Sequence, residues 1–347
     1  MNRQLRLWAV LLLVAPGYLV SLLQVMPGVP LQLAELVRFI PYYWLLPPAI
    51  LALAMLWRLP WWAYVVVMVN MILILTIVMG LRWNPGNPTP APEASVRVMT
   101  FNTKAYKARY LPGGLSTLAE EIRVQNADLV ALQDADGLLP NVPESMPRRM
   151  PPFLGYPEVY AMGQYLIASR FPIQACARVV LGPRGRSRDF MHCVVLVHGV
   201  PVTVVTAHLV SPRYSFLAVR SDPRQGFADW SASLYERLTQ SDLLIQSMQQ
   251  LPRPLLVMGD FNAREESPVV ESLLAMGFAD AYAQAGNGWG FTYGHAVHWR
   301  LDFLRIDHIL LSPEVEVRGA WVGKSRISDH HAVIADLGFA PTNTEKP

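Results

Sequence analysis

Three long apolar runs near the N-terminus place the strongest constraint on how this chain folds. Residues 7–34, 39–57 and 59–81 carry no charged side chain. A helix that crosses a lipid bilayer needs about 20 consecutive apolar residues, and each run approaches or exceeds that length. We therefore predict three transmembrane helices, near residues 7–25, 39–57 and 60–81. The prolines at positions 41, 47 and 48 predict that the second helix is bent.

The basic residues predict how this segment is oriented. Arg3 and Arg6 favour a cytoplasmic N-terminus, and Arg58 lies between the second and third runs. Three crossings then place everything after residue 82 outside the cytoplasm. A signal peptide would explain only the first run, and buried soluble helices would explain three adjacent uncharged runs poorly. Because no predicted span holds an ionisable residue, we interpret residues 1–83 as an anchor rather than a transporter.

The composition changes sharply after the apolar segment. Residues 84–94 are rich in proline and have no apolar period, which predicts a semi-rigid linker. We assign residues 95–340 to a second domain and residues 341–347 to a C-terminal tail. The net charge of +3 is too small to indicate a nucleic-acid-binding protein by itself.

The two cysteines, Cys176 and Cys193, are too few for a disulfide scaffold or a zinc site. They lie about equally far from Gly185, which marks a predicted hairpin turn, so they could face each other across two strands. A disulfide there would suit a compartment outside the cytoplasm. Two free buried thiols fit the sequence equally well.

The stretch Gly259–Asn262 follows a short apolar run, residues 255–258, that is typical of a buried strand. Gly259 permits an abrupt turn. Asp260 and Asn262 are two residues apart, so they project to one side of an extended chain. A carboxylate and an amide held there suit a metal-bound, negatively charged substrate. A local turn stabilised by Asp and Asn explains these four residues equally well.

Polar residues recur at the ends of predicted strands throughout the second domain. The predicted strands cover residues 96–101, 128–132, 165–169, 175–181, 192–197, 203–207, 255–258, 306–311, 315–321 and 332–337. Helices are predicted at 115–125, 234–248 and 268–276, and a proline-rich loop at 136–157. The polar residues at strand ends are Asn102, Asp134, His208, Asp260 with Asn262, and Asp329 with His330. Because ligand sites collect at one end of packed sheets, this regularity indicates a functional site.

Seven segments, in this order, resemble the endonuclease/exonuclease/phosphatase family. They are VMTFNT at 98–103, ADLVALQD at 127–134, LIASRFPI at 166–173, VVTAHL at 204–209, LLVMGDFNA at 255–263, RIDHILLS at 305–312 and SDHHAVIADL at 328–337. The resemblance covers residues 95–338. It implies an α/β fold, a two-sheet β-sandwich flanked by helices as in deoxyribonuclease I, here preceded by three transmembrane helices.

The resemblance also implies roles for individual residues. It implies catalytic roles for His208, Asp260, Asn262, Asp307 and His330, metal-side roles for Asn102, Asp134 and Asp329, and substrate binding by Asn262 and His208. Asp134 stands where the family has a glutamate, so the metal could bind more weakly, and Asp136 is the nearest substitute. His308 and His331 match no family role, and we expect both to be structural.

These residues predict a membrane-anchored hydrolase of phosphodiester bonds that uses Mg²⁺, with Mn²⁺ as an alternative, and water as the nucleophile. The expected partners are the lipid bilayer and a nucleic acid or lipid headgroup, and no protein partner is inferred. The loop residues Met146, Met150 and Phe153 could face lipid. Exposed arginines such as Arg213 are expected to be solvated. The alternative hypothesis is a catalytically weak, membrane-tethered interaction module of the same fold.

Overall fold

The computed structural model describes residues 2–85, 95–180, 189–295 and 300–339. The chain forms two compact units, residues 1–82 with 214–231, and residues 83–213 with 232–347. Most of the predicted linker, the predicted tail and the turn around Gly185 lie outside the described residues.

The first unit is built on apolar helices. They are α1 (Arg3–Val25), α2 (Leu31–Arg38), the 3₁₀ helix η1 (Tyr42–Trp44), α3 (Leu46–Ala54), α4 (Trp61–Leu73) and its π-helical continuation η2 (Ile74–Val78). Among the described residues, only α1 and the continuous α4–η2 helix are long and apolar enough to cross a membrane by themselves. The prediction of three transmembrane helices is therefore wrong for the second span as a single helix.

The second apolar run forms the short helices η1 and α3 rather than one bent helix. Helix α3 has only nine residues and starts with Pro47 and Pro48 next to its first position, where proline fits a helix. Helix α2 and the η1–α3 segment meet at an angle of 81°, so they cross a membrane only if the pair counts as one broken span. This pair contains an ionisable pair, Glu35 with Arg38, both of them buried. Glu35 and Arg38 belong to α2 and lie outside the predicted second span, residues 39–57, which carries no charged side chain.

Polar and aromatic contacts hold the first unit together. The side chain of Asn70 donates a hydrogen bond to the Val14 carbonyl at 3.0 Å, which joins α4 to α1. Helix α7 (Arg213–Ser221) was not predicted, and most of it belongs to this unit together with the start of α8 (Pro223–Met248). The Trp230 indole donates to the Gln32 carbonyl at 2.9 Å and packs against Phe39.

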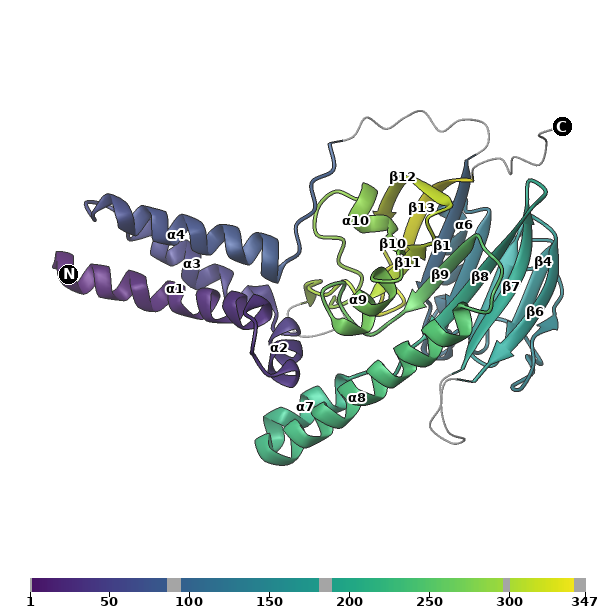
Figure 1. Cartoon of the computed structure of the whole chain (residues 1–347), viewed down its shortest axis with the longest axis horizontal. Coiled ribbons are helices and arrows are strands. Elements are labelled where there is room, and N and C mark those ends of the chain that lie inside the picture. The colour runs from purple at the N-terminus through teal and green to yellow at the C-terminus, as the bar shows by residue number, and fades with distance from the viewer. Residues whose placement is uncertain (1, 86–94, 181–188, 296–299, 340–347) are drawn as a thin grey trace. The chain divides into compact units, whose positions relative to one another are not determined.

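The second unit contains two mixed β-sheets (Figure 1). The seven-stranded sheet has the order β12 (Val315–Val322), β13 (Val333–Phe339), β1 (Val96–Asn102), β2 (Leu129–Gln133), β5 (Tyr165–Ser169), β4 (Glu158–Met162), β3 (Arg148–Arg149). The six-stranded sheet has the order β10 (Ala279–Asp280), β11 (Asp307–Leu311), β9 (Leu255–Asp260), β8 (Val200–His208), β7 (Phe190–Val197), β6 (Ile173–Val179). Its remaining helices are α5 (Ala105–Ala108), α6 (Gly114–Val124), α9 (Pro268–Leu274) and α10 (Ala281–Ala285).

Alternating apolar residues on the strands build three layers of core. One core lies between the sheets, where residues such as Val98, Val204 and Leu256 are fully buried. Helix α6 covers the outer face of one sheet through Leu118, and α8 with α9 cover the outer face of the other. Each fully buried aliphatic side chain contributes about 1.5–3 kcal/mol to folding. The predicted two-sheet sandwich flanked by helices is confirmed.

The proline-rich segment 136–157 departs from its prediction as a loop without strands. It contributes the short strand β3, and β4 follows it as a strand that the sequence analysis missed. Met150 is buried in the core under α6, and Phe153 is half-buried, whereas Met146 is 70% exposed. The expected lipid-facing surface of this loop is therefore reduced to Met146.

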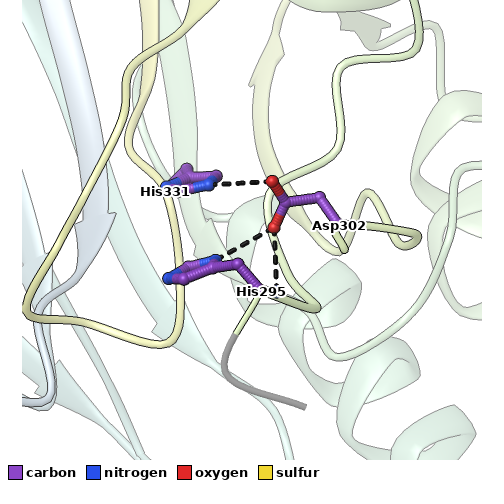
Figure 2. Close-up of side chains that lie close together, drawn as sticks. All are labelled: His295, Asp302 and His331. Carbon is purple, nitrogen blue, oxygen red and sulfur yellow. Dashed lines mark hydrogen bonds and ion pairs between the residues drawn. The ribbon is translucent and has the colours of Figure 1, made fainter. Parts of the chain in front are cut away.

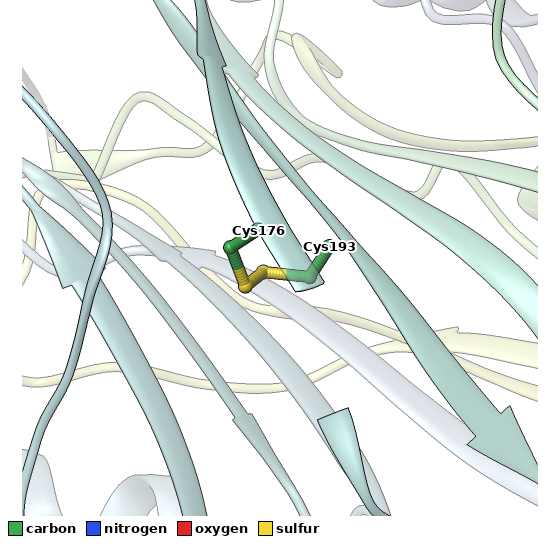
Figure 3. The surroundings of a disulfide bond; sticks show 2 residues. All are labelled: Cys176 and Cys193. Atoms are coloured by element: carbon green, nitrogen blue, oxygen red, sulfur yellow. A yellow bond between two sulfur atoms is a disulfide. The ribbon is translucent and has the colours of Figure 1, made fainter. Parts of the chain in front are cut away.

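Cys176 and Cys193 form a disulfide between β6 and β7 (Figure 3). The two residues are directly paired in the register of these antiparallel strands, and their Cα atoms are 4.1 Å apart. Of the two alternatives that the sequence left open, the structure contains the disulfide.

Gly259 lies inside β9 and makes no turn, so the expected turn at this position is wrong. A Cβ atom at residue 259 would lie 1.9 Å from the carbonyl oxygen of Ala207 on β8. Glycine is required because the two strand backbones approach closely. This close pairing sets His208, the last residue of β8, beside Asp260, the last residue of β9.

Candidate active site

Asp260 is the centre of a group of polar residues at the strand ends. Its side chain is 1% exposed. One carboxylate oxygen, Oδ2, lies 2.8 Å from Asn102 Nδ2, 3.3 Å from His208 Nε2 and 3.6 Å from His330 Nε2. The other oxygen, Oδ1, accepts a hydrogen bond from the backbone N–H of Asn262 at 2.9 Å. Residues predicted from separate sequence segments thus surround one carboxylate.

The strand register explains how these residues meet. Asp260 is paired with His208 on the parallel neighbour β8 and with Asp307 on the antiparallel neighbour β11. Asn102 ends β1 in the opposite sheet, so both sheets deliver a polar residue to the same edge. His330 lies three residues before the start of β13. The site therefore rests on strand ends, which hold side chains more rigidly than a loop.

Asn262 takes part in both structures that the sequence allowed. Its backbone has a positive φ of 49°, and its N–H closes a local turn on the Asp260 carboxylate. Its side-chain amide donates to the Leu209 carbonyl at 2.9 Å, while Arg237 donates to the Asn262 carbonyl at 3.0 Å. The turn therefore fixes the amide next to Asp260. The local turn and the functional site, the two interpretations of this stretch, are both present.

His330 is held between two carboxylates. Its Nδ1 lies 2.9 Å from Asp307 Oδ2, and its other ring nitrogen faces Asp260. Burial works against the charged form, but Asp307 and Asp260 outweigh it and raise the pKa of His330 to about 9. The Tyr293 ring covers the imidazole at a centroid distance of 5.0 Å. His330 is therefore protonated at neutral pH and forms an ion pair with Asp307.

The carboxyl group of Asp260 is buried beside a second acid, Asp307, and both conditions disfavour its charged form. Burial, with Asp307 nearby, raises the pKa of Asp260 to about 6, although His330 and Lys104 favour its charged form. A carboxylate with a pKa near neutrality is a suitable proton acceptor for a water molecule.

Three buried oxygen atoms at this edge have no hydrogen-bond donor among the residues that the structure describes. They are Asn102 Oδ1, Asp307 Oδ1 and Asp329 Oδ1. Buried acceptors without partners are rare in folded proteins and call for an ion or water. Amide and carboxylate oxygens are the ligands that Mg²⁺ prefers. The donor set of this chain therefore fits a hard divalent cation near Asn102 and Asp329.

The other predicted metal ligand, Asp134, is already paired. Its Oδ2 lies 2.5 Å from the ammonium of Lys104, a residue that the sequence analysis did not identify. Its Oδ1 lies 3.6 Å from His208 Nδ1. Burial opposes the charged form of Lys104, but Asp134 and Asp260 together raise the pKa of this lysine above its usual value. The one feature of the sequence that could have indicated Lys104 is its position, two residues after Asn102.

Gln164, Lys107 and Arg213 also lie at the site, and the sequence pattern assigned none of them to it. The side-chain oxygen of Gln164, in the turn between β4 and β5, lies 2.7 Å from His208 Nδ1 and fixes the orientation of that ring. Arg213 and Lys107 lie 3.6 and 3.5 Å from Asp329 Oδ2. The side chain of Arg213 is 50% exposed, as expected of a solvated arginine, and also forms an ion pair at the edge of the site. Asp136, the suggested substitute ligand, accepts a hydrogen bond from Arg109 through its backbone carbonyl.

Comparison with known proteins assigns the family. The sequence profile of the endonuclease/exonuclease/phosphatase family matches residues 99–330. The chain belongs to this family. The family comprises nucleases and phosphatases that typically use divalent metal ions. No curated protein sequence matches the chain.

Solved structures share the family fold. An endonuclease/exonuclease/phosphatase from Beutenbergia cavernae is 19% identical, with a TM-score of 0.52 over 71% of this chain and 72% of its own. The human Nocturnin catalytic domain with bound sulfate is 19% identical, with a TM-score of 0.50 over 71% and 94%. A mannosyl-6-phosphatase from Bacteroides thetaiotaomicron is 17% identical, with a TM-score of 0.50 over 70% and 100%. At these identities the likeness concerns the fold alone.

A second Asp–His cluster lies close to the family site in sequence. His295, Asp302 and His331 each offer an atom within 4.8 Å of the others, as a metal site would require (Figure 2). The two rings stack at a centroid distance of 4.2 Å. His295 Nδ1 lies 2.9 Å from Asp302 Oδ1, and His331 Nε2 lies 3.1 Å from Asp302 Oδ2.

Hydrogen bonds identify this second cluster as a structural clasp. His331 Nδ1 accepts the backbone N–H of Ser325 at 2.8 Å, so the ring proton is on Nε2 and points to Asp302. A ring with its proton on Nε2 cannot bind a metal through that nitrogen. His295 Nε2 donates to the Ser328 carbonyl at 2.8 Å. The clasp therefore holds the segment that carries Asp329 and His330.

The predicted structural role of His308 agrees with its contacts. Both ring nitrogens are engaged, one at 2.7 Å from Asp280 and the other at 2.9 Å from the Ala263 carbonyl. Arg305 also pairs with Asp280, at 2.8 Å. The buried charge of Asp280 is thus neutralised beneath the site rather than inside it.

Proposed function

We propose that this protein is a membrane-anchored, divalent-metal-dependent hydrolase of phosphodiester bonds. The observation that carries the proposal is the environment of Asp260, a buried carboxylate flanked by Asn102, His208 and His330. Two histidines, a base with a raised pKa and unpartnered oxygen ligands are the groups that attack by water on an anionic ester requires.

Each residue has a role that its contacts support. Asp260 orients the water and accepts its proton. The positively charged His330, held by Asp307, stabilises negative charge on the phosphate. The amide of Asn262 and the ring of His208 contact the phosphate oxygens. A bound Mg²⁺ near Asn102, Asp134 and Asp329 would neutralise phosphate charge and stabilise the leaving oxygen.

We further propose that the catalytic domain lies outside the cytoplasm. The disulfide Cys176–Cys193 supports this location, because disulfides persist in oxidising compartments. With a cytoplasmic N-terminus, two crossings would return the domain to the cytoplasm, whereas three crossings would export it. A location outside the cytoplasm therefore requires that α2 and the η1–α3 segment together cross the membrane once.

The substrate is a phosphodiester of a nucleic acid or of a lipid headgroup. Hydrolysis is measured with the full-length protein in detergent, using plasmid DNA, single-stranded DNA, a sphingomyelin-type lipid and an aryl phosphodiester. Each substrate is tested with Mg²⁺ or Mn²⁺, with EDTA, and with the Asp260→Ala variant. Asp302→Ala is the matched control, because it removes an aspartate from the structural clasp.

The expected result is turnover that EDTA and Asp260→Ala both abolish, whereas Asp302→Ala retains it. Turnover that survives EDTA and Asp260→Ala contradicts the mechanism. If a folded protein hydrolyses none of the four substrates, the alternative of a membrane-tethered interaction module is favoured.

The location has its own test in intact cells. Maleimide labelling of the half-buried Cys176 from outside should require prior reduction by a membrane-impermeant reductant and no lysis of the cells. Labelling that occurs only after the cells are lysed would place the domain in the cytoplasm.

A further inference from the structure

Lys104 places a positive charge where the proposed metal site needs an anionic ligand. Its ammonium contacts Asp134 at 2.5 Å, and both side chains are largely buried. Asp134 stands in the position of the family's metal-binding glutamate, which makes this ion pair more than a surface salt bridge.

The backbone around this pair is built to keep the two residues together. The Asp134 carbonyl accepts hydrogen bonds from the Ala105 N–H at 2.9 Å and from the Thr103 hydroxyl at 3.0 Å. These bonds lock the residues on either side of Lys104 to the end of β2. Lys104 and Asp134 both have a φ of 46°, a left-handed conformation that residues with a Cβ atom rarely adopt. Such backbone outliers cluster at functional sites.

The positive charge of Lys104 offsets part of the negative charge of the carboxylates at the site. Asp134, Asp260, Asp307 and Asp329 bring four carboxylates to one edge, and His330 balances only part of their charge. Lys104 attracts Asp260 and Asp329 as well as Asp134. A buried cluster of this kind needs cations to remain stable.

We propose that Lys104 is a tethered cation that competes with the divalent metal for Asp134. This inference rests on the proposed metal-dependent function and adds a residue that sets metal affinity. The ammonium neutralises the site when no metal is bound, and a divalent ion gains Asp134 only by displacing it. The aspartate at position 134 fits this role, because it pairs with Lys104 and therefore lowers the affinity of the site for the metal.

Lys107, in the helix α5 that follows Lys104, provides a matched comparison. It is also a lysine near a metal-side carboxylate, 3.5 Å from Asp329 Oδ2, but its side chain is 49% exposed. Solvent screens an exposed charge, so its removal changes cation binding much less. Lys104→Met and Lys107→Met thus differ mainly in burial and in contact with Asp134.

The experiment measures Mn²⁺ binding to the full-length, EDTA-treated protein by electron paramagnetic resonance, without any assay of activity. Lys104→Met should bind Mn²⁺ at least tenfold more tightly than the wild type. Lys107→Met should differ from the wild type by less than threefold, and Lys104→Arg, which keeps the charge, should stay close to it. In EDTA, Lys104→Met should unfold at a lower temperature than the wild type, and saturating Mn²⁺ should close that gap.

Each outcome decides the inference. Wild-type binding of Mn²⁺ that Lys104→Met leaves unchanged or weakens overturns the role of Lys104 and leaves the proposed function intact. If neither protein binds millimolar Mn²⁺, the proposed metal-dependent function fails and the inference fails with it. If Lys104→Met does not fold, a Lys104→Gln variant that folds and binds no more tightly than the wild type overturns the inference.

Discussion

His330 and His331 are consecutive residues, yet their rings belong to two Asp–His clusters that use their hydrogen bonds differently. His330 joins Asp307 and Asp260 in a buried site where Asp307 Oδ1 has no donor among the described residues. His331 joins Asp302 in a cluster where both of its ring nitrogens are bonded. Geometry alone would allow a metal ion in either cluster.

The difference shows how a ligand-binding cluster can be told from a structural one: in a structural cluster the polar atoms already have hydrogen-bond partners within the protein. In the cluster of His295, Asp302 and His331, both oxygens of the acid accept hydrogen bonds, and the fixed ring proton of His331 excludes it as a ligand. Around Asp260, by contrast, buried acceptors remain for a cation, water or substrate to satisfy. The first arrangement stabilises a segment, and the second is prepared for a ligand.

The largest expected effect comes from Asp260→Asn. Replacing this carboxylate by an amide removes the proposed proton acceptor and should lower kcat about a thousandfold. Stability should be unchanged or higher, because a buried charge is lost. Turnover and thermal unfolding of the same preparation check both parts. A kcat within tenfold of the wild type would exclude Asp260 as the base.

The pH dependence should follow the same cluster. Asp260, with a pKa of about 6, is ionised above that pH, and His330, with a pKa of about 9, keeps its proton below that pH. We expect kcat/KM to be highest between these values and to fall about tenfold per unit on either side. The stability gained from the raised pKa of His330 is complete below about pH 6.5 and is lost as pH rises through about 9.

A pH–rate profile and unfolding midpoints across this range provide the measurements. The Asp302→Asn variant should keep the same two limits of activity. An acidic limit that stays near pH 4 in the wild type would show that Asp260 has an ordinary pKa and would weaken its assignment.

The clasp should respond to mutation in the opposite way. Asp302→Asn weakens hydrogen bonds to His295 and His331, and should lower the free energy of unfolding by about 1–2 kcal/mol. Turnover should fall less than tenfold at a temperature where the variant is folded. Chemical denaturation gives the first quantity. A loss of turnover as large as that of Asp260→Asn, in a stable protein, would remove the distinction between the clusters.

The smallest expected effect on stability is that of Gln164→Ala. Gln164 fixes His208 through a single hydrogen bond, so its loss should lower kcat/KM about tenfold and leave stability nearly unchanged. Steady-state kinetics measures the first quantity and thermal unfolding the second. Wild-type kinetics in Gln164→Ala would show that the strand end alone orients the ring.

Local patterns predicted much of the fold. The β9 strand and the residues at its end follow from an apolar run with polar residues after it, and the two-sheet sandwich follows from the seven family segments. Strand β4 was missed because it follows a long proline-rich stretch. Length and hydropathy predicted one bent helix over residues 39–57, where the structure has the short helices η1 and α3.

The candidate site was predictable where one strand carries the residues, as at Asp260 and Asn262. It was not predictable where two side chains meet only through folding. Lys104 and Asp134 are thirty positions apart, and β1–β2 pairing brings them together. The sequence likewise offers no sign that His331 turns away from its neighbour, because that depends on the backbone N–H of Ser325.

Because Gly259 has no room for a Cβ atom, this position is suited to a temperature-sensitive mutation. A methyl group there would press on the Ala207 carbonyl and force β8 and β9 apart, without altering any side chain at the site. Gly259→Ala should therefore yield a heat-sensitive allele, in which warming removes the protein from cells and cooling allows newly made protein to work. Such an allele would reveal what the cell loses first when this protein disappears.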